Sequence, residues 1–287
     1  MTEPWIRFLL PVPEQTLPFY IDSIGYNNHE QFMSRPEGYP CYHWLHTASG
    51  SGIIHLESHS VTLPENHGIL LLPGVAHEYE AVGERWSTYY LTFNGQLVNE
   101  TAASLGIRFS SVYHWHIGSA FKQVLPSMIS GVEAYRDITG LDHSIEVYRF
   151  LVELKKHGKV DNQPSFYSLK ERLLPLLQFL ESEYRDPDLD MNTMAAILDI
   201  SARQLNSLFR KAFGYTPYQY LISLRLLKAK QFLIMDRRLT VQSVSAMTGF
   251  REASHFIATF RKAEGMTPEK FRLMHGRSPD NAAAARQ

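Results

Sequence analysis

The side chains best suited to binding chemistry lie in the last third of the chain, where one pattern occurs twice. Residues 205–220 align without a gap with residues 256–271, and both segments contain F-R-K-A-x-G-x-T-P. Arginine and lysine bind phosphate groups, and arginine and asparagine also hydrogen-bond to the edges of DNA bases. The repeat therefore indicates two similar surfaces that bind nucleic acid. We predict no catalytic residue in the chain.

The elements that carry these residues are predicted to be short helices. Ser201 followed three residues later by Gln204 matches a capping box. Gly214 and Gly265 stand where a helix ends in a left-handed residue, and a Thr-Pro pair after each begins the next helix. The leucines and phenylalanines of each copy share one stripe and are assigned to the core. Each copy therefore reads as a helix-turn-helix motif.

The region from about Leu169 to His275 resembles the DNA-binding domain of the AraC/XylS family of bacterial transcription regulators. The family signature G-F-x-x-x-S-x-F-x-x-x-F-[RK]-[RK]-x-x-G-x-T-P-x-x-[FY]-R is matched between Gly249 and Arg272. The resemblance implies two motifs joined by a long helix, here Tyr218 to about Met235. It also implies recognition helices in successive major-groove segments of a double-stranded DNA operator, with RNA polymerase as a further partner.

The outward positions of the two motifs supply the predicted DNA contacts. The predicted base contacts are Arg203, Asn206, Ser207, Ser254 and His255. The predicted phosphate contacts are Ser201, Arg210, Lys211, Arg261 and Lys262. Because the family often has a polar or basic residue where Ala258 stands, we expect the first motif to carry most of the base recognition.

The N-terminal half has a different pattern. Short strand-like runs in residues 42–81 are broken by Gly-Ser-Gly, Pro-Glu-Asn and Pro-Gly, which is the spacing of a small antiparallel barrel. The stretches GSG and LLLPGVAH resemble the effector-binding domain of sugar-responsive members of the same family. The predicted fold class is a two-domain α+β protein with an N-terminal jelly-roll or cupin-like β-barrel and an all-α C-terminal domain.

A sugar site needs aromatic faces and a few polar groups. Trp44 and His46 share one strand face with Tyr42, and other aromatic residues recur after residue 78. Arg35 matches the position at which arabinose-type relatives use an arginine on the sugar. The predicted effector-binding residues are Arg35, Trp44, His46, Tyr79, Trp86, Thr88 and Tyr90. The competing interpretation assigns the aromatic residues to the barrel core and Arg35 to a surface ion pair.

The histidines of this half raise the alternative of a cupin-type metal enzyme. Such a site needs His-x-His and a later Glu and His, whereas His43 and His46 are three apart and would point to opposite faces of a strand. We therefore predict no metal and no cofactor. The same sequence also fits a regulator that responds to a non-sugar ligand, or an architectural DNA-binding protein without an effector.

Composition fits a two-domain regulator. The chain has 287 residues, a net charge of −1 and one cysteine, Cys41. Residues 168–276 carry 16 Lys and Arg against 11 Asp and Glu, so the C-terminal part is the basic one. No stretch resembles a signal peptide or a membrane span, so we expect a cytoplasmic protein with no membrane partner.

The predicted domains are a barrel at 1–118, a helical dimerisation segment at 119–157, a linker at 158–167, the DNA-binding domain at 168–276 and a flexible tail at 277–287. An apolar stripe in the helical segment predicts a homodimer. Its members are Leu141, Ile145, Tyr148, Leu151, Val152 and Leu154. The proline-rich residues 9–18 correspond to the arm that folds over bound sugar in arabinose-type relatives.

Overall fold

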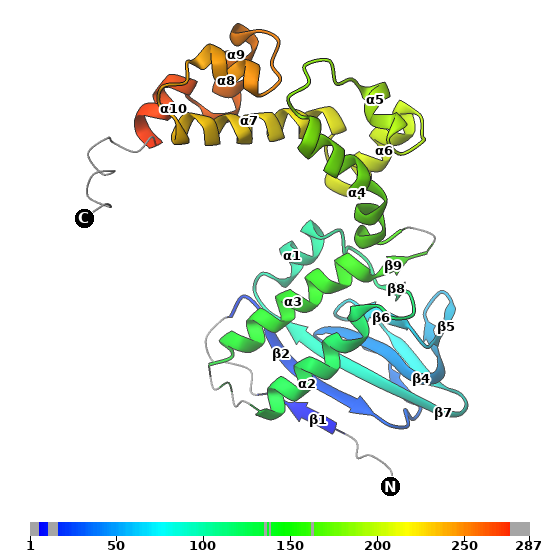
Figure 1. Ribbon diagram of the computed structural model, residues 1–287. Coiled ribbons are helices and arrows are strands. Elements are labelled where there is room, and N and C mark those ends of the chain that lie inside the picture. Colours follow the sequence, from blue (N-terminus) through cyan, green and yellow to red (C-terminus); the bar gives the residue numbers. More distant parts are fainter. Residues whose placement is uncertain (1–5, 11–16, 135–136, 138, 162–163, 276–287) are drawn as a thin grey trace. The chain divides into compact units, whose positions relative to one another are not determined.

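The computed structural model describes residues 6–10, 17–134, 137, 139–161 and 164–275 (Figure 1). The chain forms two compact units, Met1–Ser168 and Leu169–Gln287. The first unit is built on an antiparallel sheet and the second on helices, so the predicted two-domain fold class is confirmed. None of the described helices is long and apolar enough to cross a membrane.

The first unit contains one nine-stranded sheet, with the order β1-β2-β7-β4-β6-β8-β9 and with β3 paired to β7 and β5 paired to β4. Its strands are β1 (Ile6–Leu9), β2 (Tyr20–Asn27), β3 (Met33–Arg35), β4 (Tyr42–Leu56), β5 (Ser60–Pro64), β6 (His67–Leu71), β7 (His77–Asn94), β8 (Ser111–His114) and β9 (Lys159–Val160). The long pair β4 and β7 shifts register between Thr47 and Ser49 and again between Gly50 and Gly52. Such bulges bend a strand, so one strand can take part in both halves of the sheet.

The two faces of the β4–β7 pair contribute to two different hydrophobic cores. Tyr42, Trp44 and Phe93 belong to a core shared with the helices. Leu45, Tyr79 and Trp86 belong to a second core on the other face. This division follows from the alternation of side chains along a strand, because residues directly opposite each other in the β4–β7 register share a face.

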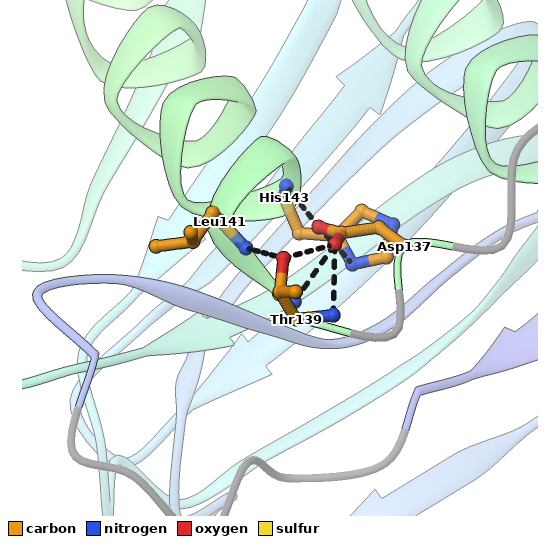
Figure 2. Close-up of polar contacts among 5 residues, drawn as sticks. Asp137, Thr139, Leu141 and His143 are labelled. Carbon is orange, nitrogen blue, oxygen red and sulfur yellow. Dashed lines mark hydrogen bonds and ion pairs between the residues drawn. The ribbon is translucent and has the colours of Figure 1, made fainter.

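Two helices cover the first of these faces, α2 (Val124–Ala134) and α3 (Leu141–His157), both drawn in green in Figure 1. Asp137 positions the start of α3. Its carboxylate accepts hydrogen bonds from the Thr139 hydroxyl at 2.7 Å, from the Gly140 amide at 2.9 Å and from the His143 amide at 3.1 Å (Figure 2). These bonds satisfy amide groups that have no partner within the helix.

The predicted apolar stripe of α3 divides into two faces. Leu151 and Leu154 are fully buried in the core against the sheet, so their assignment to a subunit interface is wrong. Leu141, Ile145 and Tyr148 instead point outward and are 57%, 64% and 49% exposed. The error arose because position 151 lies about 60° to 120° of helix rotation from positions 141, 145 and 148, and position 154 lies about 120° to 180° from them, toward the sheet.

The second unit holds the two predicted helix-turn-helix motifs. The helices are α4 (Phe166–Glu183), α5 (Met191–Ala196), α6 (Ala202–Phe213), α7 (Pro217–Met235), α8 (Val241–Met247), α9 (Ala253–Glu264) and α10 (Pro268–His275). One core joins α4, α5, α6 and the first half of α7, and another joins the second half of α7 with α8, α9 and α10.

The predicted ends of these helices are confirmed. Ser201 and Gln204 form a reciprocal capping box at the start of α6, and Thr216 with Gln219 forms another at α7. Gly214 and Gly265 end α6 and α9 in the left-handed conformation, at φ 82° and 71°. Phe256 and Phe260 are fully buried, as expected for core positions.

Two predicted segments differ from the structure. Within the predicted linker, Lys159 and Val160 pair with β8, and Phe166 already begins α4. The predicted arm begins at Leu9, but Leu9 lies in β1, which pairs along its length with β2. Residues 11–16 of that arm and the predicted tail at 277–287 lie outside the described residues.

Candidate functional site

A cavity of about 130 Å³ opens on the inner face of the sheet. Its lining combines charged, hydroxyl and aromatic side chains from β1, β2, β3, β4, β7 and the loops beside them. The lining residues are Arg7, Ser23, Asn27, Glu30, Met33, Arg35, Tyr39, His43, Leu45, Tyr79, Tyr90 and Thr92. This volume is below the roughly 300–1,000 Å³ of sites for drug-sized ligands, so the cavity would hold only a small molecule.

Arg35 is held in position on one wall. Its guanidinium carbon lies 4.6 Å from the centre of the Tyr39 ring, and its Nη1 lies 3.3 Å from His43 Nδ1. Burial, followed by the charge of Arg35, lowers the pKa of His43 well below its usual value, so the imidazole is neutral and can accept from the guanidinium. Arg35 forms no ion pair within 4 Å among the described residues, which leaves its charge available to a ligand.

Glu30 supplies an acidic group to the same cavity. It is 6% exposed, and Thr88 donates a hydrogen bond of 2.5 Å to its Oε2. Burial raises the pKa of Glu30, while the hydrogen bonds from Thr88 and Asn27 act in the opposite direction. Hydrogen bonds therefore fix the Glu30 carboxyl group in the cavity, where it can accept a hydrogen bond from a ligand, while Arg35 can donate one.

Two tyrosines provide aromatic surface and hydroxyl groups. Tyr79 packs edge-on against Trp86, with ring centres 6.0 Å apart. Tyr90 lines the cavity, and its buried hydroxyl oxygen has no hydrogen-bond partner among the described residues. Burial raises the pKa of Tyr90 to about 12, so this hydroxyl stays protonated at neutral pH. An unpaired buried hydroxyl is costly in free energy, and a ligand atom in the cavity would pair with it.

Five of the predicted effector residues lie in or beside the cavity. Arg35, Tyr79 and Tyr90 line the cavity. Trp86 and Thr88 lie one layer behind it: the Trp86 indole donates to Thr47 at 2.9 Å, and Thr88 holds Glu30. Their predicted contact with an effector is indirect in this arrangement.

Trp44 and His46 lie on the face of β4 opposite the cavity, which corrects their predicted assignment to the effector site. Both contact the core under the helices, where Trp44 donates to His46 Nδ1 at 2.9 Å and packs against Phe121 and Phe150. Burial lowers the pKa of His46 to about 3, so it is a neutral core residue. On β4 the cavity face belongs instead to His43 and Leu45, the alternate positions.

The residues that sequence reasoning missed are Glu30, Tyr39 and His43 above all. His43 could have been found from the strand register, because His43 lies opposite Thr92, and Leu45 lies opposite Tyr90. His43 and His46 do point to opposite faces, as predicted. Among the described residues, no group of three His, Cys, Asp or Glu side chains could hold a metal ion.

A larger cavity, of about 300 Å³, lies between α2, α3 and Ile21. Its exposed lining is mostly apolar, and four of its polar side chains, those of Asp137, His143, Glu146 and Arg149, already have partners. Asp137 is occupied at the start of α3, and Glu146 pairs with Arg149 at 3.4 Å. The smaller cavity is therefore the better candidate for a polar ligand.

The predicted DNA contacts lie on α6 and α9. Arg203, Ser207, Arg210 and Lys211 are exposed along α6, whereas Asn206 is half-buried with its Oδ1 oxygen unpaired among the described residues. Ser201 is exposed, but its hydroxyl also accepts from the Gln204 amide at 3.2 Å. The outward side of α6 is therefore basic and polar.

The second motif presents a similar surface. Ser254, His255, Arg261 and Lys262 are exposed on α9, with Ser254 3.3 Å from Glu252 Oε2 and His255 edge-on to Phe250. Arg261 and Lys262 lie in the last turn, as Arg210 and Lys211 do in α6. The two copies of the sequence repeat thus form equivalent exposed helices.

Family models match both halves of the chain. A helix-turn-helix domain model matches residues 194–274, and an AraC-like ligand binding domain model matches residues 20–151. The chain belongs to the AraC family of transcriptional regulators. The predicted resemblance is therefore confirmed, and all residues that line the cavity except Arg7 lie within the matched ligand-binding domain.

Relatives from three bacteria show the extent of the similarity. The Msm operon regulatory protein of Streptococcus mutans is 24% identical over 78% of this chain and 81% of its own length. The activator RhaS of Escherichia coli is 26% identical over 55% of this chain and 57% of its own. The regulator GbdR of Pseudomonas aeruginosa is 25% identical over 48% of this chain, and the match spans 37% of GbdR. All three of these relatives are named as regulatory proteins.

Proposed function

We propose that this AraC family member regulates transcription by binding operator DNA through α6 and α9, under the control of a carbohydrate held in the 130 Å³ cavity. The observation that carries the ligand class is the convergence of the Arg35 guanidinium, the Glu30 carboxyl and the unpaired Tyr90 hydroxyl beside the Tyr79 ring. A sugar offers hydroxyl groups that both donate and accept, and C–H faces that pack on aromatic rings.

DNA contact is assigned by residue type and position. Arg203, Asn206 and Ser207 on α6, with Ser254 and His255 on α9, are proposed to contact base edges. Ser201, Arg210, Lys211, Arg261 and Lys262 are proposed to contact phosphates. The basic last turns of both helices support this assignment, because exposed lysine and arginine there meet no acidic partner within 4 Å among the described residues.

We also propose that the protein acts as a homodimer in the cytoplasm, with RNA polymerase as a partner at the promoter. Leu141, Ile145 and Tyr148 form the exposed apolar line of α3 that supports a subunit contact. A ligand can change DNA binding only if it favours one arrangement of the protein over another. Arg7 on β1 lines the cavity, so the N-terminal strand is a candidate for the part that responds.

A thermal-shift screen of the full chain against neutral and acidic monosaccharides tests the ligand class. A sugar that raises the melting temperature of the wild-type protein and not of an Arg35→Gln variant would support the cavity as its site. The same sugar should then change affinity for DNA selected from a random library by the wild-type protein. If only non-sugar molecules stabilise the protein through Arg35, the carbohydrate assignment is wrong and the regulator responds to another ligand.

A further inference from the structure

The helix α7 runs through both motifs of the second unit, and one residue near its middle, Arg225, has an unusual environment. Leu224 packs in the core of the first motif and Leu226 in the core of the second. Arg225, between them, is 4% exposed. Burial lowers the pKa of Arg225, yet the guanidinium remains charged because arginine stays protonated at all physiological pH values. A charged side chain therefore lies at the junction of the two motifs.

Among the described residues, the guanidinium of Arg225 donates hydrogen bonds only to backbone carbonyls and not to an acid. Its Nε donates to the Tyr184 carbonyl at 2.9 Å, and its Nη2 donates to the Asp186 carbonyl at 2.6 Å. No carboxylate lies within 4 Å of Arg225 in the described part of the chain. Both carbonyls lie just beyond Glu183, the last residue of α4, where the helix dipole favours a cation.

The second motif meets the same loop from its own turn. Gly249, between α8 and α9, has φ 77°, and a Cβ atom there would lie 2.4 Å from the Tyr184 carbonyl oxygen and 2.9 Å from Arg225 Nε. Arg251 pairs with Asp188. The Phe250 ring lies 5.9 Å from the Arg225 guanidinium carbon. We call these contacts, between Arg225, Gly249 and Arg251 and the loop at residues 184–188, the inter-motif contact.

We propose that the inter-motif contact fixes the orientation of α6 relative to α9, and so restricts which spacing of two DNA segments the protein accepts. Burying a guanidinium without an anion costs free energy that ordinary core residues would not. Its directional bonds to two carbonyls supply something that apolar packing cannot, namely one defined angle between two small cores. Arg225 and Gly249 are thus positioning residues and touch no DNA.

A competing account gives this role to α7 alone, because a continuous helix also separates the motifs by a set distance. The two accounts predict different outcomes for a variant that lacks the inter-motif contact and keeps α7. A helix holds its two ends at a distance but leaves each small core free to tilt about it. The proposal predicts that α6 and α9 then change their relative orientation.

The first test measures the distance between α6 and α9 in the full chain without DNA. Spin labels are placed at Ser207→Cys and Ala258→Cys, equivalent exposed positions of the repeat, in a Cys41→Ala background and diluted with unlabelled protein. We expect a narrow distance distribution in this background. Arg225→Leu should broaden it, Gly249→Ala should shift it, and Arg225→Lys should fall between, because an ammonium group cannot bridge both carbonyls as the guanidinium fork does.

Lys230→Ala is the matched control, since it removes a 2.8 Å pair between α7 and Glu264 that lies within the second motif. It should leave the distribution unchanged. Arg251→Ala, an exposed position, tests the same contact if Arg225→Leu fails to fold. Distributions like the background's in folded Gly249→Ala and Arg251→Ala variants would overturn the proposal and leave the role to α7.

The second test uses DNA selected from a random library by the wild-type protein, with one base pair then inserted between the two contacted segments. Wild-type protein should lose affinity by about tenfold or more on the longer DNA, as for a mismatched site. Arg225→Leu and Arg251→Ala should lose less than about threefold. Equal losses in wild type and variants would contradict the proposal. This inference rests on DNA binding by α6 and α9, but the spin-label test stands even if no DNA is bound.

Discussion

Because the hydroxyl of Tyr90 is unpaired, we predict that replacing Tyr90 with phenylalanine changes protein stability and ligand affinity in opposite directions. In the protein without ligand, this buried oxygen has no partner among the described residues. Removing a buried hydroxyl that makes no hydrogen bond costs nothing in bonding and relieves an unfavourable burial. The free energy of unfolding of Tyr90→Phe should therefore equal that of the wild type or exceed it by up to about 1 kcal/mol.

Ligand binding should weaken in the same variant. If a sugar hydroxyl pairs with Tyr90, the phenylalanine leaves that buried group unpaired, at a cost of about 1 to 3 kcal/mol. This corresponds to a loss of about 5-fold to 150-fold in affinity. Calorimetric titration with the sugar found by thermal screening measures the loss, and urea unfolding without sugar measures the stability.

Tyr42→Phe is the matched control, because Tyr42 lies on the opposite face of the sheet and its hydroxyl donates to Asn99 at 2.8 Å. This variant should lose about 1 kcal/mol of stability, or about 2–4 °C in melting temperature, and keep its sugar affinity. The reasoning is refuted if Tyr90→Phe is destabilised as much as Tyr42→Phe, or if it binds the sugar as tightly as the wild type.

Substitutions at four other places in the molecule have distinct expected outcomes. Arg35→Gln should abolish the sugar-induced rise in melting temperature while the free protein melts within about 2 °C of wild type, since Arg35 makes no ion pair in the described part of the structure; a retained sugar response would move the site elsewhere. Ile145→Asp should give a folded monomer in sedimentation analysis, and a dimer that survives this substitution would contradict the proposed α3 interface. Leu151→Asp should instead unfold the first unit, because Leu151 is fully buried. Arg203→Ala should weaken binding to selected DNA by about 1 to 3 kcal/mol and leave random DNA nearly unaffected, while Lys262→Ala should weaken both; equal losses on both DNAs would remove Arg203 from the base contacts. For Asp137, burial acts to raise the carboxyl pKa, but the hydrogen bonds from Thr139, His143 and Gly140 prevail and lower it. Its contribution to stability, about 1 kcal/mol for a helix cap, is therefore present above the unfolded pKa near 4 and lost as pH falls through the lower folded value. Asp137→Asn should be less stable than wild type at pH 7 in urea unfolding, with the difference shrinking below pH 4; a difference independent of pH would contradict the assigned charge.

The helical unit was predictable because its signals are local. The two boxes of Ser201 with Gln204 and of Thr216 with Gln219 involve residues three apart, and the end of each recognition helix is marked by a glycine. The repeat also helped, because the same pattern in two segments supported the assignment of each segment to a helix-turn-helix motif. The inter-motif contact was not predictable in this way, because Arg225 and Tyr184 are 41 residues apart.

The ligand cavity depended on pairing between distant strands. Tyr79 and Tyr90 were chosen for their chemistry and do line the cavity, but their strand β7 is bent, with register shifts in its pairing with β4. The alternation along β4 was recognised, yet nothing local shows which face is covered by helices. Trp44 was chosen because it is aromatic, and a large aromatic residue is equally suited to the core under α2 and α3.

The alternation of β4 has an evolutionary consequence. His43 and Leu45 face the cavity, and Trp44 and His46 lie in the core on the other side, where Trp44 packs against Phe150 of α3. Point substitutions at the first pair change the chemistry offered to a ligand without altering the packing beneath α3. If the cavity holds the effector, as proposed, a gene duplicate would acquire a different ligand through a few codon changes in one short stretch of β4, while the exposed face of α3 and the outward sides of α6 and α9 stay unchanged. Insertion or deletion of one codon there would exchange the two faces and destroy both.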